Sequence, residues 1–170
     1  MKLDLSRYFP VGIERRKYIA RLIYSAAIAL IYSMGFLVRL AGAHGELYTE
    51  LADGTRVLIK GAAAPDFAEL LRESVLGGSM LGFLALAALD LLLAAYFYYY
   101  HYQGSRSIYL MRRLPQRGEL HRRCLAFPIF SVLALLLLMA LTTAAYFLIY
   151  MSVMPAECVR PGQLGRLFGF

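Results

Sequence analysis

The residue whose type and position most clearly suggest chemistry is Asp90. It is the only charged side chain in an apolar stretch from Val75 to Tyr102. An ionisable group in hydrocarbon must face protein, water or a partner, so it marks either proton or ion transfer or a polar contact between helices. About 15 residues of helix would place this carboxylate about 22 Å from the start of the stretch. Arg21, beside the first apolar stretch, is the nearest candidate partner by depth, and the hydroxyl of Tyr24 is another. We expect a polar contact between helices, because one lone aspartate does not make a proton relay.

Residues 105–117 have the composition of a docking element. Ser105 or Ser107 can cap a short helix, and Pro115 must end it because proline cannot continue the backbone hydrogen bonding. Ile108, Met111 and Leu114 would then share an apolar face, with the arginines projecting elsewhere. A helix of this kind suits a groove on a cytoplasmic protein, whereas an ordinary basic loop needs neither the apolar face nor the proline. The predicted docking residues are Ser105, Arg106, Ile108, Tyr109, Met111, Arg112, Arg113, Leu114, Pro115 and Arg117.

The other reactive side chains are scattered along the chain. His44, His101 and His121 occur singly, without the spacing of a metal site. Cys124 and Cys158 flank the third apolar stretch, so a crossing helix would place them on opposite sides of a membrane and prevent their pairing. No phosphate-binding loop, nucleophile–base pair or cofactor motif appears. The sequence therefore predicts no catalytic residue, no metal ligand and no cofactor, and we expect that the chain is not an enzyme.

The composition is typical of a small integral membrane protein. The chain has 170 residues, of which 60% are hydrophobic, and a net charge of +7. The positive residues cluster beside apolar stretches, which membrane topology explains without nucleic-acid binding. We predict an all-α, single-domain integral membrane protein, residues 1–170, with three transmembrane helices and a cytoplasmic N-terminus. The predicted segments are a leader (1–21), crossings at 22–40, 75–102 and 125–154, an external insertion (44–73), a cytoplasmic coupling-type elbow (103–124) and an external tail (155–170).

The ends of the crossings carry further signals. The leader is either plain topogenic charge or a short amphipathic helix on the inner leaflet. Ala41-Gly42-Ala43 has the form of a signal-peptide cleavage site, but the long charged leader and the nearby Arg39 favour a retained helix. The third crossing lies in about 33 uncharged residues, more than one straight crossing needs. Pro128 should bend its start and Pro155 should end it.

The external insertion should contain a hairpin and a short helix. The segments LYTEL and RVLIK alternate in the manner of strands around a turn at Ala52-Asp53-Gly54. Asp66 can cap a following helix whose apolar face is Phe67, Leu70 and Leu71, and Glu69 completes a capping box. The insertion is either a cap that meets a substrate or partner, or a connector.

In the second crossing, glycines at helical spacing should allow close helix approach. They are Gly77, Gly78 and Gly82.

The elbow and its flanks resemble the first cytoplasmic loop of bacterial ABC-transporter permeases of the export class. Ser105-Arg106 stands at the family's Ser-Lys/Arg start, and Leu114-Pro115, Arg117 and Leu120 stand in its "hxLPxxRxxL"-like core. In that family, this segment forms the coupling helix that contacts the ATPase. The resemblance covers about residues 18–155, and the chain looks particularly like small three-helix membrane proteins of Gram-positive bacteria encoded beside ABC ATPases.

The resemblance implies a multi-pass protein of the bacterial plasma membrane that couples a separate cytoplasmic ATPase to the membrane part through residues 105–123. Family permeases usually have six or more spans, so three spans imply either a half-permease that oligomerises or an accessory subunit. The implied partners are an ABC-type ATPase, other permease subunits or further copies of the chain, and membrane lipids. The alternative is a membrane sensor or scaffold whose external loop binds a peptide or lipid and regulates a partner.

Overall fold

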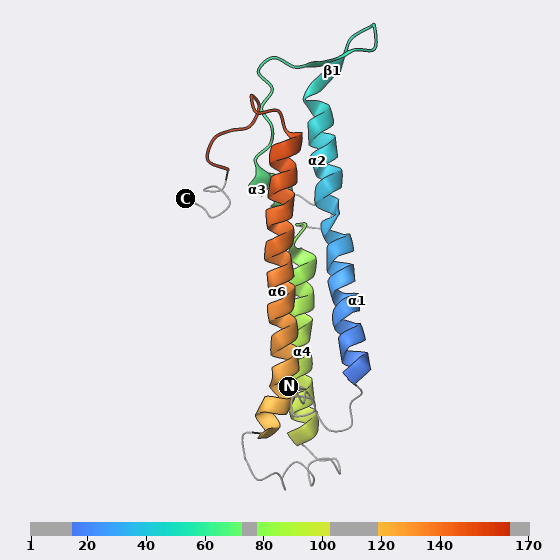
Figure 1. The fold of residues 1–170 in the computed structure, drawn as a ribbon, viewed down its shortest axis with the longest axis vertical. Helices are drawn as coiled ribbons and strands as arrows, with labels where there is room; N and C mark the ends of the chain where they lie inside the picture. The colour runs from blue at the N-terminus through green and yellow to red at the C-terminus, as the bar shows by residue number, and fades with distance from the viewer. Residues whose placement is uncertain (1–14, 73–77, 103–118, 164–170) are drawn as a thin grey trace, which may run out of the picture. The chain divides into compact units, whose positions relative to one another are not determined.

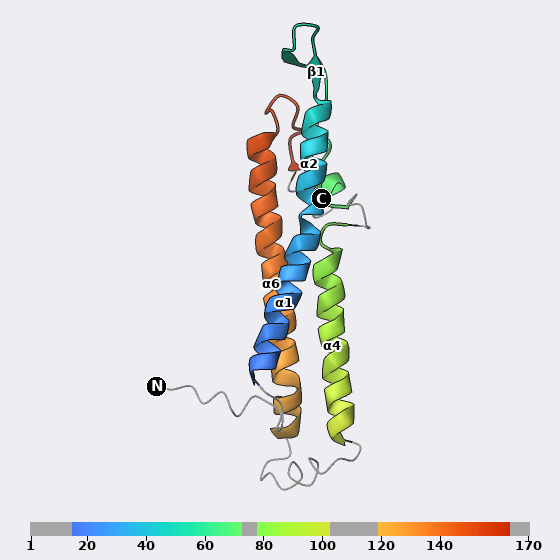
Figure 2. The same cartoon turned by 90° about the vertical axis from the view of Figure 1, so that its right-hand side faces the viewer.

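The structure is a computed structural model that describes residues 15–72, 78–102 and 119–163. These residues are mostly helical, with one short hairpin (Figures 1 and 2). The elements in chain order are α1 (Arg15–Ser33), α2 (Gly35–Glu46), β1 (Tyr48–Glu50), β2 (Arg56–Leu58), α3 (Phe67–Arg72), α4 (Leu81–Tyr102) and α6 (Glu119–Val153). They fall into two compact units, the first within residues 1–28 and 83–138 and the second within residues 29–82 and 139–170.

Two helical segments are long and apolar enough to cross a membrane. Arg16–Glu46 has 31 residues and Leu125–Val153 has 29, with mean hydropathies of 1.7 and 2.5. In each, only 22% of the most apolar window is buried, whereas the core helix of a soluble protein is mostly buried. The apolar part of α4, Leu81–Tyr96, is shorter than the approximately 20 residues that a straight crossing requires. Two of the three predicted crossings therefore have the length and composition of a membrane span.

The first long helical segment extends beyond its predicted crossing in both directions. It begins at Arg15 and reaches Glu46, with an interruption at Met34 between α1 and α2. The hydroxyl of Ser33 donates to the carbonyl of Leu30 at 2.7 Å, and Gly35 follows directly. A serine and glycine at such a point are a common cause of a helix break. The predicted cleavage sequence at residues 41–43 lies inside α2.

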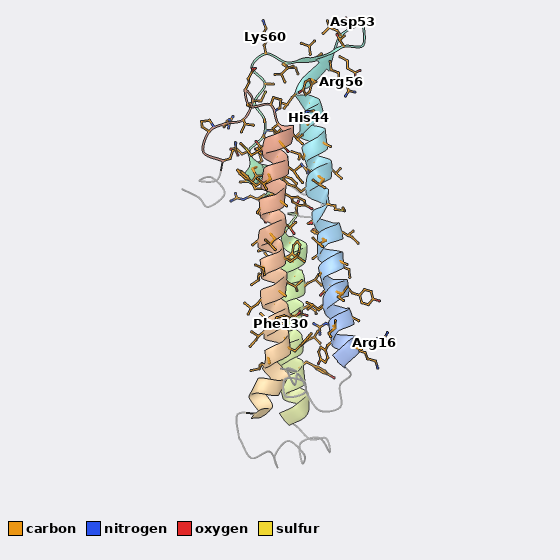
Figure 3. All side chains as sticks on the ribbon, viewed as in Figure 1. Arg16, His44, Asp53, Arg56, Lys60 and Phe130 are labelled. Carbon is orange, nitrogen blue, oxygen red and sulfur yellow. The ribbon has the colours of Figure 1, made fainter. Side chains whose placement is uncertain are left out.

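The predicted β-hairpin is present in the second unit. β1 and β2 are antiparallel, with Tyr48 opposite Leu58 and Glu50 opposite Arg56. Gly54 closes the turn with a φ of +79°, a conformation that glycine adopts without strain. The side-chain hydroxyl and the backbone N–H of Thr55 both donate to Asp53, at 2.7 and 3.2 Å, and these bonds lower the pKa of that carboxyl. Figure 3 shows Asp53 and Lys60 at this hairpin.

The core of the second unit is aromatic and includes the predicted apolar face of α3. Phe67, Leu70 and Leu71 are all buried. The rings of Phe36 and Tyr146 are stacked with centroids 4.8 Å apart, and Phe67 meets the edge of Phe147 at 5.2 Å. Large aromatic side chains dominate the stability of such cores because each buries a large apolar surface. The predicted insertion is therefore tied to α2 and α6 by packing and is not a loose loop.

The predicted glycine stripe on the second crossing is wrong at Gly78. The helix α4 begins at Leu81, and Gly78 precedes it with a φ of +130°. A positive φ is incompatible with a right-handed helix, so Gly78 cannot contribute to a helical face. Gly82 does lie in the helix and allows close approach: a Cβ there would stand 3.0 Å from Cδ1 of Tyr32. Gly77 lies outside the described residues.

The helix α6 begins at Glu119 and ends at Val153, just before Pro155, in agreement with the expected stop. Pro128 lies inside the helix, where its ring removes one backbone hydrogen bond. The 35 residues span about 52 Å, well beyond the approximately 30 Å of a hydrocarbon core. The hydroxyl of Thr143 donates to the carbonyl of Met139 at 2.9 Å, so this polar group is satisfied within its own helix.

Candidate functional site

The carboxylate of Asp90 joins three helices of the first unit. Asp90 lies on α4 and is only 2% exposed. Its Oδ1 accepts a hydrogen bond from a guanidinium nitrogen of Arg21 on α1, and its Oδ2 accepts one from the hydroxyl of Ser131 on α6. Each carboxylate oxygen therefore has a partner from a different helix. We name Arg21, Asp90 and Ser131 the polar junction.

The packing around the polar junction supports this arrangement. Tyr18 lies one helical turn before Arg21, and Phe127 lies one turn before Ser131. The rings of Tyr18 and Phe127 meet edge to face, with centroids 4.8 Å apart. This contact holds α1 and α6 together beside the carboxylate. The sequence spacing of i, i+3 on one helix and i, i+4 on the other places each ring on the same face as the polar group it supports.

The polar junction is built to hold a charge in place. The side chain of Arg21 is 35% exposed and that of Asp90 is 3% exposed, so the carboxylate is buried while part of the arginine side chain meets the surface. A buried carboxylate is tolerated when it is paired and hydrogen-bonded, as it is here. Arginine stays protonated in proteins, so this partner cannot accept or release a proton. The geometry fits a structural contact between helices.

Sequence reasoning found two of the three members of the polar junction. The structure brings Asp90 and Arg21 together, and it does not use the other candidate, Tyr24, whose side chain is 70% exposed. Ser131 was missed because a single serine in an apolar helix is common. The one signal that could have identified Ser131 is its position along the helix. It lies as many residues after the start of α6 as Asp90 lies before the end of α4.

The predicted docking residues, from Ser105 to Arg117, lie outside the described residues, so their role stays a prediction. The side chains of His101, His121 and Cys124 also lie outside the described part of the chain. Cys158 is a buried free thiol. Among the side chains that the structure describes, no three from His, Cys, Asp or Glu gather as a metal site would require.

The described residues thus contain two long apolar helices, the polar junction, and a folded insertion made of the hairpin and α3. All three are properties of the chain itself. Comparison with known proteins found no matching family model, no matching curated protein and no matching solved structure.

Proposed function

We propose that this chain is a three-crossing membrane subunit of an ABC-type export complex, which transmits motion from a separate cytoplasmic ATPase. The observation that carries the proposal is the polar junction and its distance from the elbow. Asp90 lies on α4 some distance before that helix ends at Tyr102. Its partner Ser131 lies the same number of residues after α6 begins at Glu119. Both distances correspond to about 18 Å of helix. A force on the elbow would reach the same buried carboxylate along both helices.

The exposed surfaces of the helices support a membrane location for this subunit. On α6, the apolar side chains of Leu133, Leu137 and Leu141 are each at least 60% exposed. On α1, Ile23 and Ile31 are similarly exposed. Contiguous apolar surfaces of this kind are rare on soluble monomers and are expected where lipid or another membrane subunit covers the helix. The proposed location is the bacterial plasma membrane.

The proposed orientation follows the charge distribution. Arg16 and Lys17 are exposed at the start of α1, and the elbow sequence is rich in arginine. Short loops with an excess of lysine and arginine remain on the cytoplasmic side. With α4 as the third crossing, the N-terminus and the elbow face the cytoplasm, and the hairpin of β1 and β2 faces outward. The partners would be the ATPase at the elbow and membrane subunits along the helices.

Co-purification tests the docking role of the elbow. The triple variant Ile108→Asp, Met111→Asp and Leu114→Asp places three charges on the proposed apolar face, so the ATPase should be lost from the purified complex. Burying unpaired carboxylates in an apolar groove is strongly unfavourable, and we expect at least about a hundredfold loss of the bound ATPase. Mass spectrometry of the purified complex from the native host measures it, with the amount of inserted subunit as the reference.

A matched control carries the same three charges off that face. The variant Gln103→Asp, Leu110→Asp and Gln116→Asp changes the net charge of the elbow equally and should retain the ATPase. Retention of the ATPase by the first variant would refute the docking role. Loss from both variants would show that the overall charge of the elbow matters and would refute a specific apolar face.

A further inference from the structure

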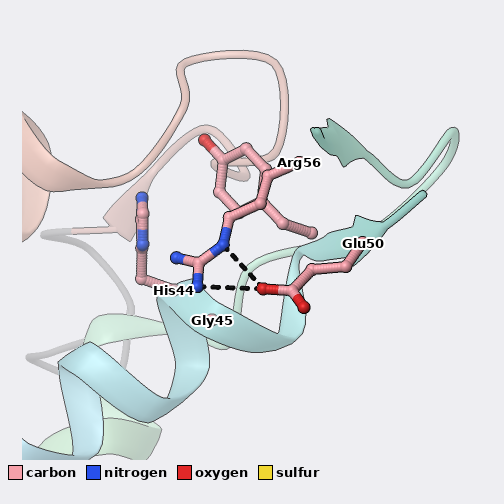
Figure 4. Close-up of a pocket in the computed structure, with 5 residues that line it drawn as sticks. His44, Gly45, Glu50 and Arg56 are labelled. Carbon is pink, nitrogen blue, oxygen red and sulfur yellow. Dashed lines mark hydrogen bonds and ion pairs between the residues drawn. The ribbon is translucent and has the colours of Figure 1, made fainter. Parts of the chain in front are cut away.

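The hairpin and the last turn of α2 enclose an open recess in the second unit. Its volume is about 360 Å³, and its lining residues are His44, Gly45, Tyr48, Glu50 and Arg56 (Figure 4). Small-molecule sites usually measure about 300–1,000 Å³ and combine an apolar wall with a few polar groups. This recess has both, and it lies in the insertion for which the sequence left a binding role open. We name it the hairpin recess.

One wall of the hairpin recess is aromatic. The ring centroids of His44 and Tyr48 lie 5.0 Å apart, and their planes are tilted by 48°. His44 comes from the last turn of α2 and Tyr48 begins β1, so the helix and the hairpin each contribute one ring. Two rings in this arrangement form an angled wall that a ligand side chain can contact.

The rim of the hairpin recess is an exposed ion pair. Nε and Nη2 of Arg56 each lie 3.0 Å from the same oxygen, Oε1, of Glu50 (Figure 4). The two side chains are 72% and 67% exposed, so the pair contributes little to the stability of the fold. Among the described residues, Oε2 of Glu50 and Nη1 of Arg56 have no hydrogen-bond partner. The recess therefore presents one free anionic acceptor and one free cationic donor side by side.

Gly45 forms the floor of the hairpin recess (Figure 4). A Cβ at this position would have no heavy atom within 4 Å. Glycine weakens a helix relative to almost any other residue, so nothing in the packing of α2 requires it here. Its effect is to leave space under the aromatic wall.

We propose that the hairpin recess binds a small zwitterion with an apolar side chain, of the size of an amino acid or dipeptide. Glu50 and Arg56 together carry no net charge, so a singly charged ligand gains one attraction and one repulsion of similar size. A ligand with an ammonium group facing Glu50 and a carboxylate facing Arg56 gains both attractions. Its side chain packs against His44 and Tyr48. This inference does not depend on ATPase docking.

Four probes test the recognition elements separately, with the full chain in an uncharged maltoside detergent. Phenylalanine carries all three groups, N-acetylphenylalanine lacks the cation, phenylalaninamide lacks the anion and glycine lacks the ring. Saturation-transfer NMR should show saturable binding of phenylalanine, and each of the other probes should bind about fivefold or more weakly. Absence of saturable phenylalanine binding, or equal binding of all four probes, would overturn the proposal.

Two glycine variants localise the site. Gly45→Leu fills the floor of the hairpin recess and should weaken phenylalanine binding about tenfold or more. Gly42→Leu is the matched control, because Gly42 lies one turn away on α2, has equally open surroundings and does not line the recess. It should bind phenylalanine like the unmodified chain. Equal binding by the two variants would place the ligand elsewhere, and their circular dichroism spectra report whether both are folded.

A third variant and a fifth probe define the ligand chemistry. Glu50→Gln should weaken phenylalanine binding, because the attraction to its ammonium group is lost. The same variant should strengthen the binding of N-acetylphenylalanine, because that anionic probe is no longer repelled by Glu50. An equal effect on both probes would refute the predicted contact. A zwitterionic lipid headgroup offers the same charges, so glycerophosphoethanolamine is added as a competitor. If glycerophosphoethanolamine displaces phenylalanine at a concentration lower than the one at which phenylalanine itself half-saturates the recess, the recess is assigned to lipid. That result would overturn the amino-acid proposal.

Discussion

Asp90 lies inside an apolar helix, and two other helices satisfy both of its carboxylate oxygens. Arg21 supplies the opposite charge and Ser131 supplies a hydroxyl donor. Removing one member of a buried ion pair is costly because the other charge is left without compensation. The partial exposure of Arg21 reduces this cost, since its guanidinium can turn toward water or lipid headgroups. At the scale of residues, the polar junction should therefore show strong coupling between its members.

We predict that Asp90→Leu lowers the free energy of unfolding by about 2 kcal/mol, because Arg21 is left unpaired. The double variant Arg21→Leu and Asp90→Leu should recover most of that loss, since no uncompensated charge remains. Ser131→Ala should cost less, about 1 kcal/mol, because it removes one hydrogen bond. Denaturant unfolding in detergent measures all of these. The coupling would be contradicted if the double variant lost as much free energy of unfolding as Arg21→Leu and Asp90→Leu lose when their separate effects are added.

The helix α3 shows how an element too short to be stable alone is held in place. It has only six residues, whereas isolated helices of fewer than about 12 are marginal in water. Gln163, which is 5% exposed, accepts a hydrogen bond from the backbone N–H of Phe67 at 3.0 Å. Its amide donates to Asp66 at 3.3 Å and to the carbonyl of Arg160 at 3.2 Å. The segment after α6 is thereby fastened to the start of α3.

Replacing this glutamine should loosen α3 without unfolding the chain. Gln163→Ala leaves the Phe67 N–H and the Arg160 carbonyl without their partner, at a cost of about 1–2 kcal/mol. Amide hydrogen exchange across Phe67–Arg72 should accelerate about tenfold as a result. Ser152→Ala is the control, because the exposed Ser152 hydroxyl bonds only to its own helix, at Ile149. Unchanged exchange in α3 would show that core packing alone holds this helix.

At the scale of the whole molecule, the number of crossings decides which partners each segment can meet. Arg16–Glu46 and Leu125–Val153 each suffice for a crossing by length and composition. If α4 also crosses, the hairpin and the elbow lie on opposite sides of the membrane. If α4 does not cross, they lie on the same side, and the elbow cannot meet a cytoplasmic ATPase while the hairpin faces outward.

Cysteine labelling distinguishes these arrangements. In a background with Cys124→Ala and Cys158→Ala, a membrane-impermeant maleimide should label Asp53→Cys in intact cells, because the positive-inside rule places the hairpin outside. It should label Gln116→Cys only after the membrane is permeabilised. Mass-shift electrophoresis reads both results. Labelling of both positions in intact cells would contradict the three-crossing proposal.

The local elements of this protein were largely predictable from its sequence. The turn residues at 52–54, between alternating segments, predicted the hairpin, and the apolar spacing of Phe67, Leu70 and Leu71 predicted the buried face of α3. Depth along a helix reduced the candidate partners of Asp90 to Arg21 and Tyr24, and the structure pairs it with Arg21. These features depend on neighbouring residues or on a helical rise that is the same in every helix. The elbow residues remain a prediction of the same kind.

The contacts between distant segments were decided only by the tertiary structure. Ser131 and Gln163 are ordinary residues until the fold places one against Asp90 and the other against Phe67. Gly78 lies in a bend before α4 and not on a helical stripe, and Gly45 lines a recess that no sequence pattern marks. Sequence spacing determines which residues share a helix face, but the rotation of each helix against its neighbours comes from packing. That rotation selects which side chain meets which.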